Sequence, residues 1–397
     1  MAWTERDNML YRRSVFVALL FLLLSLTAMA QEMEEASIDG TNITYRYTPI
    51  VEDERTALER YLDPDLGERN VRFNIIGGPG YSANTGWRLA AMGNLYYRQS
   101  STSTTPGILS IVATASLTGY YNVAIRGTNT LYDSRHRLSY SMGLCSEPTY
   151  LWGLDYDTAA GNDAGRYTEC DYGAWFKYRY AITNSLFLSV GAEYQNIEAR
   201  RMDARAQLLT RALNNHISTL AVGLGLGIDT RRSAENRTRG VYAAVDFYTR
   251  PKFISNVGSN LYTLNITFDF YQPLWRGATL ALDLYGEFHN TTTPWLLRAE
   301  LGGESRMRGY YRGRYNGNNL VATQVELRQH IWEGLGATIW GGAGEVFSKG
   351  DNFAWRKVLP TYGAGIRWSF NALMAVRLEM AFGRNSRYFI LGFNDAF

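Results

Sequence analysis

The chain lacks the features that mark most helical membrane proteins. Beyond residue 30, no apolar run reaches the roughly 18 residues that a membrane-spanning helix needs, which excludes helical spans. Proline is scarce, with 9 against 38 glycines, and the mean hydropathy is only −0.24. Yet 14% of the residues are aromatic. This combination indicates a transmembrane β-barrel, in which every second strand residue faces water and aromatic girdles lie at the membrane interfaces.

Residues for catalysis are also scarce. The four histidines show no metal-ligand spacing, and no G-x-S-x-G motif is present. We therefore expect no enzyme activity, no metal and no cofactor. The formal charge of +3 is too small to indicate a nucleic-acid partner.

Only two cysteines occur, Cys145 and Cys170, at the two edges of a predicted long loop. In an exported protein a disulfide between them is chemically allowed and would staple the hairpin. The alternative is two free thiols in lipid-facing or loop positions.

The N-terminus predicts export. Arg12 and Arg13 precede an apolar core over residues 15–26, and Ala28 and Ala30 form an A-x-A cleavage site. We predict a signal peptide over residues 1–30; the alternative is an N-terminal membrane anchor. Residues 31–70 are polar and charged, and we interpret them as a periplasmic lead-in.

From residue 71 onward, apolar and polar residues alternate in many segments. Val376, Leu378 and Met380, for example, alternate with charged residues. Such a strand needs surroundings of opposite character on its two faces. About sixteen segments of spanning length can be placed, so we predict an all-β transmembrane antiparallel β-barrel over residues 71–397. A soluble sandwich would show the same period, but the strand length and the signal peptide favour the barrel.

Loop lengths and the C-terminus indicate the bacterial outer membrane. Long loops are expected at residues 146–168, 199–217, 290–318 and 347–358. In outer-membrane barrels, long outer loops alternate with short periplasmic turns. The chain ends in Phe397 with apolar residues at alternate positions, an outer-membrane recognition pattern that Asp395 interrupts.

Three stretches carry a family resemblance. Gly302 and Gly303 are followed by Met307, Arg308, Gly309 and Tyr310; residues 227–231 read Gly-Ile-Asp-Thr-Arg before Thr-Arg-Gly at 238–240; and residues 79–86 form a Pro-Gly-rich hairpin. Together these stretches resemble the BamA/TamA family of outer-membrane assembly barrels, of the bacterial surface antigen type. The resemblance covers about residues 71–397 and implies a short form lacking POTRA domains.

The resemblance implies that the sixth outer loop folds into the barrel and that its arginine docks on inner carboxylates. Met307, Arg308, Gly309 and Tyr310 would form this loop latch. By strand parity, Glu326 and Glu379 face inward and are the candidate partners of Arg308. The family often carries an inward Asp where this chain has Gly342, so the ion pair must form elsewhere or be lost. A structural latch, a part in the assembly mechanism and simple filling of the lumen all remain open.

A weak lateral seam between the first and last strands is also implied. Gly77, Gly78, Pro79 and Gly80 would weaken the first strand, and Phe393 lies on the last. A glycine-rich turn explains the same four residues without any function.

We therefore expect a barrel that assembles or translocates outer-membrane proteins. Its partners would be outer-membrane lipid, unfolded outer-membrane protein clients or a separate periplasmic partner, and no nucleic acid. The alternative is a passive pore or a structural surface barrel without insertase activity.

Overall fold

The computed structural model describes residues 70–98, 106–131, 135–161, 163–231, 238–348, 353–371 and 374–393. The predicted signal peptide, the predicted lead-in apart from Asn70, and the C-terminal Phe397 lie outside the described residues.

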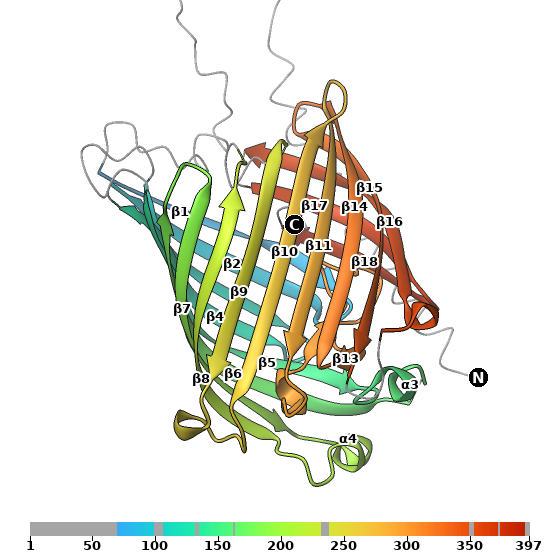
Figure 1. Ribbon diagram of the computed structural model, residues 1–397. Helices are drawn as coiled ribbons and strands as arrows, with labels where there is room; N and C mark the ends of the chain where they lie inside the picture. The colour runs from blue at the N-terminus through green and yellow to red at the C-terminus, as the bar shows by residue number, and fades with distance from the viewer. Residues whose placement is uncertain are drawn as a thin grey trace, which may run out of the picture. The chain divides into compact units, whose positions relative to one another are not determined.

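Sixteen antiparallel strands of the described residues form one closed barrel (Figure 1), as predicted. Consecutive strands pair with each other around the wall, and β1 closes the barrel against β18. The strands of the barrel wall are β1 (Val71–Ser82), β2 (Gly86–Tyr97), β3 (Gly107–Ser116), β4 (Tyr121–Leu131), β5 (His136–Leu151), β6 (Gly165–Ala181), β7 (Leu186–Arg200), β8 (His216–Asp229), β9 (Gly240–Arg250), β10 (Leu261–Pro273), β11 (Ala278–His289), β14 (Asn319–Trp332), β15 (Leu335–Phe347), β16 (Leu359–Asn371), β17 (Met374–Gly383) and β18 (Ser386–Phe393).

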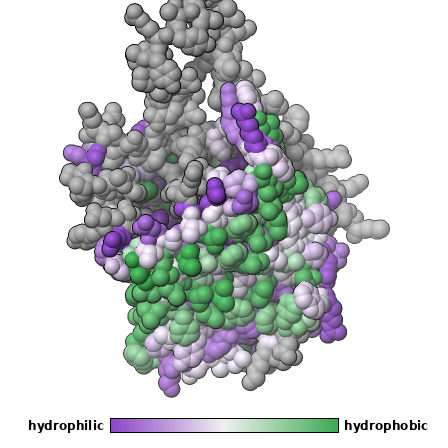
Figure 2. Space-filling model, turned by 45° about the horizontal axis from the view of Figure 1, so that its top comes forward, coloured by the Kyte–Doolittle hydropathy of each residue, from purple (hydrophilic) through white to green (hydrophobic). Residues whose placement is uncertain are grey.

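The two faces of the wall differ as the alternation predicts. On β8, Val222, Leu224 and Leu226 are exposed while the glycines between them are buried on the inner side. Figure 2 shows the result as a hydrophobic belt between hydrophilic rims. Inner-facing polar residues bond to one another: Asn94 Nδ2 donates to Asn74 Oδ1 at 2.9 Å. A belt of this kind suits a wall with lipid outside and a polar interior.

The short helices and the small hairpin lie at one end of the barrel, which we call the long-loop end. Figure 1 shows α3 and α4 at this end, at the bottom of the view. They are α3 (Tyr156–Ala159), α4 (Ala204–Leu209), η1 (Lys252–Ile254), η2 (Trp295–Leu297), η3 (Trp355–Lys357) and the small hairpin of β12 (Ala299–Leu301) and β13 (Tyr315–Gly317). None of the described helices is long and apolar enough to cross a membrane.

The predicted disulfide is wrong, because both cysteines are free. Cys145 and Cys170 lie within β5 and β6, not at the edges of a loop. The register sets Cys145 opposite Asp171 and Cys170 opposite Ser146. This offset of one residue sends the two side chains to opposite faces of the wall, where no S–S bond can form.

Replacing Leu224 with Arg should cost about 2–4 kcal/mol of unfolding free energy, because a charge at mid-wall would face lipid. Leu224 is 67% exposed on β8. Urea unfolding in phospholipid vesicles measures the loss. The control is Gln195→Arg on β7, which points into a polar interior cavity and should change stability little. Equal losses in both variants would contradict the assignment of the two faces.

Candidate functional site

The sixth loop, residues 290–318, connects β11 to β14 and carries the β12–β13 hairpin. Its apolar side chains pack against wall strands. Leu301, Met307 and Tyr310 are buried with Val346 of β15 and Leu359 of β16. This contact fixes the tip of the hairpin, so that its arginines meet the inner faces of the neighbouring strands.

Arg308 lies between the two carboxylates that strand parity indicated. Its Nη2 donates to Glu326 Oε2 of β14 at 2.5 Å, and its Nη1 donates to Glu379 Oε1 of β17 at 2.7 Å. The three side chains are 0%, 3% and 2% exposed. Charge-assisted bonds of this kind are the strong ones, and they are needed here because a buried guanidinium without partners is very costly.

Position 342 carries no acid, and the carboxylates that bind Arg308 come from β14 and β17. Gly342 pairs with Gln324 and Thr361 in the wall. The same strand, β15, supplies a ring instead: the guanidinium carbon of Arg308 lies 4.0 Å from the ring centre of Trp340. A cation over an indole face is attracted by the negative face of the ring. Trp340 shares the inward parity of position 342, but the sequence did not single it out.

The other latch residues pack at the β16–β18 side. Tyr310 Oη donates to Pro360 O at 2.6 Å and accepts from the Arg384 backbone N–H at 2.7 Å. A Cβ on Gly309 would lie 2.5 Å from the Phe382 carbonyl oxygen. Only glycine permits this backbone approach, and Gly309 O also accepts from Ser386 Oγ. Gly309 and Tyr310 therefore hold the loop against the last hairpin of the barrel.

A second arginine of the loop was missed. Arg306 donates to both oxygens of Asp283 on β11, at 2.7 and 2.8 Å, and its guanidinium lies 4.1 Å from the ring centre of Tyr285. Asp283 is fully buried. The signal was present in the sequence, because Asp283 falls on the inner face and Arg306 precedes Arg308 by two residues.

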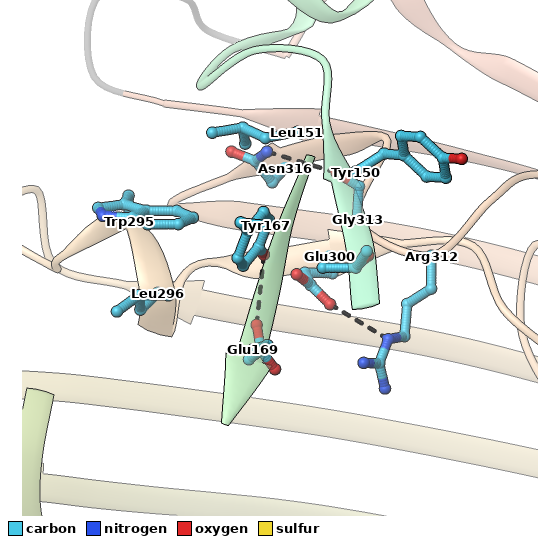
Figure 3. A pocket seen from close by; sticks show the side chains of 11 residues that line it. Tyr150, Leu151, Tyr167, Glu169, Trp295, Leu296, Glu300, Arg312, Gly313 and Asn316 are labelled. Carbon is cyan, nitrogen blue, oxygen red and sulfur yellow. Dashed lines mark hydrogen bonds and ion pairs between the residues drawn. The ribbon is translucent and has the colours of Figure 1, made fainter. Parts of the chain in front are cut away.

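A third arginine, Arg312, contacts acidic residues at the long-loop end (Figure 3). It donates to Glu147 of β5 at 2.8 Å and lies 3.5 Å from Glu300 of β12. Desolvation raises the pKa of Glu300, the charge of Arg312 opposes that rise, and Glu147 adds to it. Desolvation lowers the pKa of Arg312, but the charges of Glu147 and Glu300 outweigh it and the pKa is raised. Arg312 therefore stays charged and holds the hairpin to β5.

The seam residues lie in β1. Gly77, Gly78, Pro79 and Gly80 all pair with β2, and the turn follows at residues 83–85, so the glycine-turn explanation is wrong. Between β1 and β18 the described residues give one aligned pair, Tyr81↔Leu391. In that antiparallel register, Phe393 falls opposite Pro79. The described part of β18 therefore ends before the first eight residues of β1. Only the backbone of Phe393 is described, paired with Val376.

Among the described residues, no group of three or more His, Cys, Asp or Glu side chains is placed to hold a metal ion.

Comparison with models of known protein families shows the family of this chain. The Omp85 superfamily domain matches residues 77–388, most of the chain. The chain belongs to the Omp85 superfamily. An Omp85 barrel of this type is located in the bacterial outer membrane. A search of curated protein sequences gives no match.

Solved structures agree with the Omp85 fold. BamA from Haemophilus ducreyi lacking POTRA domains 1-3 is 14% identical, with a TM-score of 0.56 over 82% of this chain and 70% of that one. CdiB from Acinetobacter baumannii is 12% identical, with a TM-score of 0.56. CdiB from Escherichia coli is 13% identical, with a TM-score of 0.57. Each of these two matches covers 82% of this chain. The match spans 60% and 63% of the two CdiB chains. At these identities, the likeness concerns the fold alone.

Replacing Arg308 with Ala should lower the unfolding free energy by about 3–5 kcal/mol, because two buried carboxylates lose their shared cation. The triple variant Arg308→Ala, Glu326→Gln, Glu379→Gln should lose still more, because the buried Arg328 and Arg377 then also lose their carboxylate partners. Urea unfolding in vesicles measures both.

The matched control for Arg308→Ala is Arg276→Ala, at an exposed turn position, which should fall within about 0.5 kcal/mol of wild type. If the Arg308→Ala barrel were as stable as the Arg276→Ala barrel, the ion pairs of Arg308 with Glu326 and Glu379 would contribute nothing to the unfolding free energy.

Proposed function

We propose that this Omp85 barrel assembles or translocates outer-membrane proteins by opening sideways between β1 and β18. The junction of these two strands carries the proposal. β1 is paired with β2 along its whole length, from Val71↔Tyr97 to Ser82↔Gly86. Against β18, the described residues give only Tyr81↔Leu391. A strand edge released from its neighbour is a template for pairing with another chain.

The composition of β1 supports the same proposal. Pro79 has no N–H to donate to a neighbouring strand, and glycine strands lose side-chain packing. When the two strands separate, an unfolded client could add its own strand to this edge, with main-chain hydrogen bonds replacing those to β18. The proposed clients are unfolded outer-membrane proteins, delivered with or without a separate periplasmic partner.

The occupied lumen also favours a lateral route. The sixth loop lies on the inner wall of β11, β14 and β17 through Arg306 and Arg308, and its hairpin reaches β5 through Arg312. A polypeptide moving along this side of the lumen would have to break those pairs. Passage at the seam would not break the buried Arg308 pairs.

A disulfide across the seam tests the proposal. Tyr81→Cys and Leu391→Cys, with Cys145 and Cys170 replaced by Ser, join residues that are Cα partners, a separation that suits an S–S bond. In proteoliposomes, the reduced barrel should accelerate insertion of an unfolded test outer-membrane protein. Oxidation should abolish the acceleration because the seam cannot open.

The matched control joins Leu224→Cys to Phe247→Cys, partners across β8 and β9. Oxidising that pair should leave activity unchanged. Full activity of the oxidised Tyr81–Leu391 barrel would refute a route through the seam.

A passive pore is the second candidate, and one observation favours it. A cavity of about 170 Å³ lies beside the inner residues of β4 to β7, including Arg126, Cys145, Asp171 and Glu193. A pore through this region would conduct ions with the seam cross-linked. Steady conductance of the oxidised barrel in planar bilayers, together with no effect on client insertion, would favour the pore over the assembly role.

A further inference from the structure

Glu304, in the sixth loop, contacts both flanks of the seam. Arg88 of β2 donates from Nη1 and Nη2 to its two carboxylate oxygens, at 2.5 and 2.6 Å. Arg377 of β17 donates from Nη2 to its backbone carbonyl oxygen, at 2.7 Å. β2 adjoins β1 and β17 adjoins β18. A single loop residue therefore links the strands next to the two seam strands.

The two seam strands leave room for these arginines. A Cβ on Gly80 of β1 would lie 3.0 Å from Arg88 Nε and 3.3 Å from the Leu391 carbonyl oxygen of β18. A Cβ on Gly392 of β18 would lie 3.5 Å from Nε and Nη2 of Arg377. Each arginine thus lies over an inward-facing glycine on the seam strand beside it. The glycines provide a flat surface across which both side chains reach Glu304.

The two halves of this link differ in strength. Arg377 Nη1 also donates to Glu379 at 2.7 Å, and Glu379 holds the buried Arg308. That side is therefore part of the buried ion-pair group. On the other side, Arg88 and Glu304 are 16% and 29% exposed. A partly exposed pair is weaker and more sensitive to salt than a buried one, so separation should begin at Arg88–Glu304.

Two further hydrogen bonds join the sixth loop to the strands on either side of the seam. Asn84, in the turn between β1 and β2, accepts from the backbone N–H of Arg312 at 3.1 Å. Ser386, at the start of β18, donates to the carbonyl oxygen of Gly309. The sixth loop is thus bonded to the first and the last hairpins of the barrel, where the described strand pairing is shortest.

We infer that Glu304 is a clasp that holds the β1–β18 seam closed, and that breaking the Arg88–Glu304 pair is the step that permits opening. This inference rests on the proposed function, because it assigns the control of the same seam. The sixth loop would then set how often the seam opens, with no change to the strands themselves.

The test measures seam width by electron–electron distances between spin labels. Labels are placed at Leu89→Cys on β2 and Leu378→Cys on β17, in a barrel with Cys145 and Cys170 replaced by Ser and held in lipid nanodiscs. Glu304→Gln should raise the ratio of wide to narrow separations about tenfold, since a charged hydrogen-bond partner is lost. High salt should raise the wide fraction in the wild type and have little further effect in the variant.

Two further variants keep the test specific. Glu198→Gln makes the same change at the Arg200–Glu198 pair on β7, far from β1 and β18 in the strand order, and should leave the distances as in wild type. Arg88→Gln should widen the seam as Glu304→Gln does, and the double variant should go no further, because both changes remove one pair. Additive effects would contradict a shared clasp.

The outcome is separable from that of the proposed function. If Glu304→Gln leaves the seam narrow while the oxidised Tyr81–Leu391 barrel loses activity, the clasp is wrong and the lateral route stands. If Glu304→Gln widens the seam while the oxidised barrel keeps its activity, the clasp stands and the lateral route is wrong.

Discussion

A guanidinium with no exposed surface must have its charge balanced inside the protein, and this requirement fixes the interior of the barrel. Arg308 is balanced by Glu326 on β14 and Glu379 on β17, two strands separated by β15 and β16. One side chain therefore holds together an arc of four strands from the inside. Because its loop must reach this point, the other loop arginines are brought within range of their own carboxylates.

The ion pairs continue beyond this arc. Arg328 bonds to the second oxygen of Glu326, and Arg377 bonds to the second oxygen of Glu379, so cations and anions alternate from β14 to β17. Through the Glu304 backbone and carboxylate the series reaches Arg88 on β2. It thus passes over the junction of β1 and β18. At this junction, side chains of the sixth loop therefore link the strands on either side, in addition to the pairing of β1 with β18.

Much of the barrel follows from local sequence. Strand alternation depends only on lipid and water lying on opposite faces, so it predicted sixteen strands and the inward direction of Glu326 and Glu379. Register and long-range contacts do not follow in the same way. The disulfide failed because a one-residue offset between β5 and β6 separates Cys145 from Cys170, and no local pattern reveals such an offset. The Arg88–Glu304 pair joins residues 216 positions apart, and Trp340 meets Arg308 only after the loop has folded.

The central claim is that the Arg88–Glu304 pair of the sixth loop holds the seam closed. Hydrogen–deuterium exchange in lipid nanodiscs tests this most directly, by comparing the wild-type barrel with the Glu304→Gln barrel at the backbone amides of residues 71–80, with residues 321–328 of β14 as the reference. The account predicts that amides of β1 exchange about tenfold faster in Glu304→Gln while those of β14 are unchanged, because exchange follows local opening. Equal exchange of β1 in the two barrels would contradict the account.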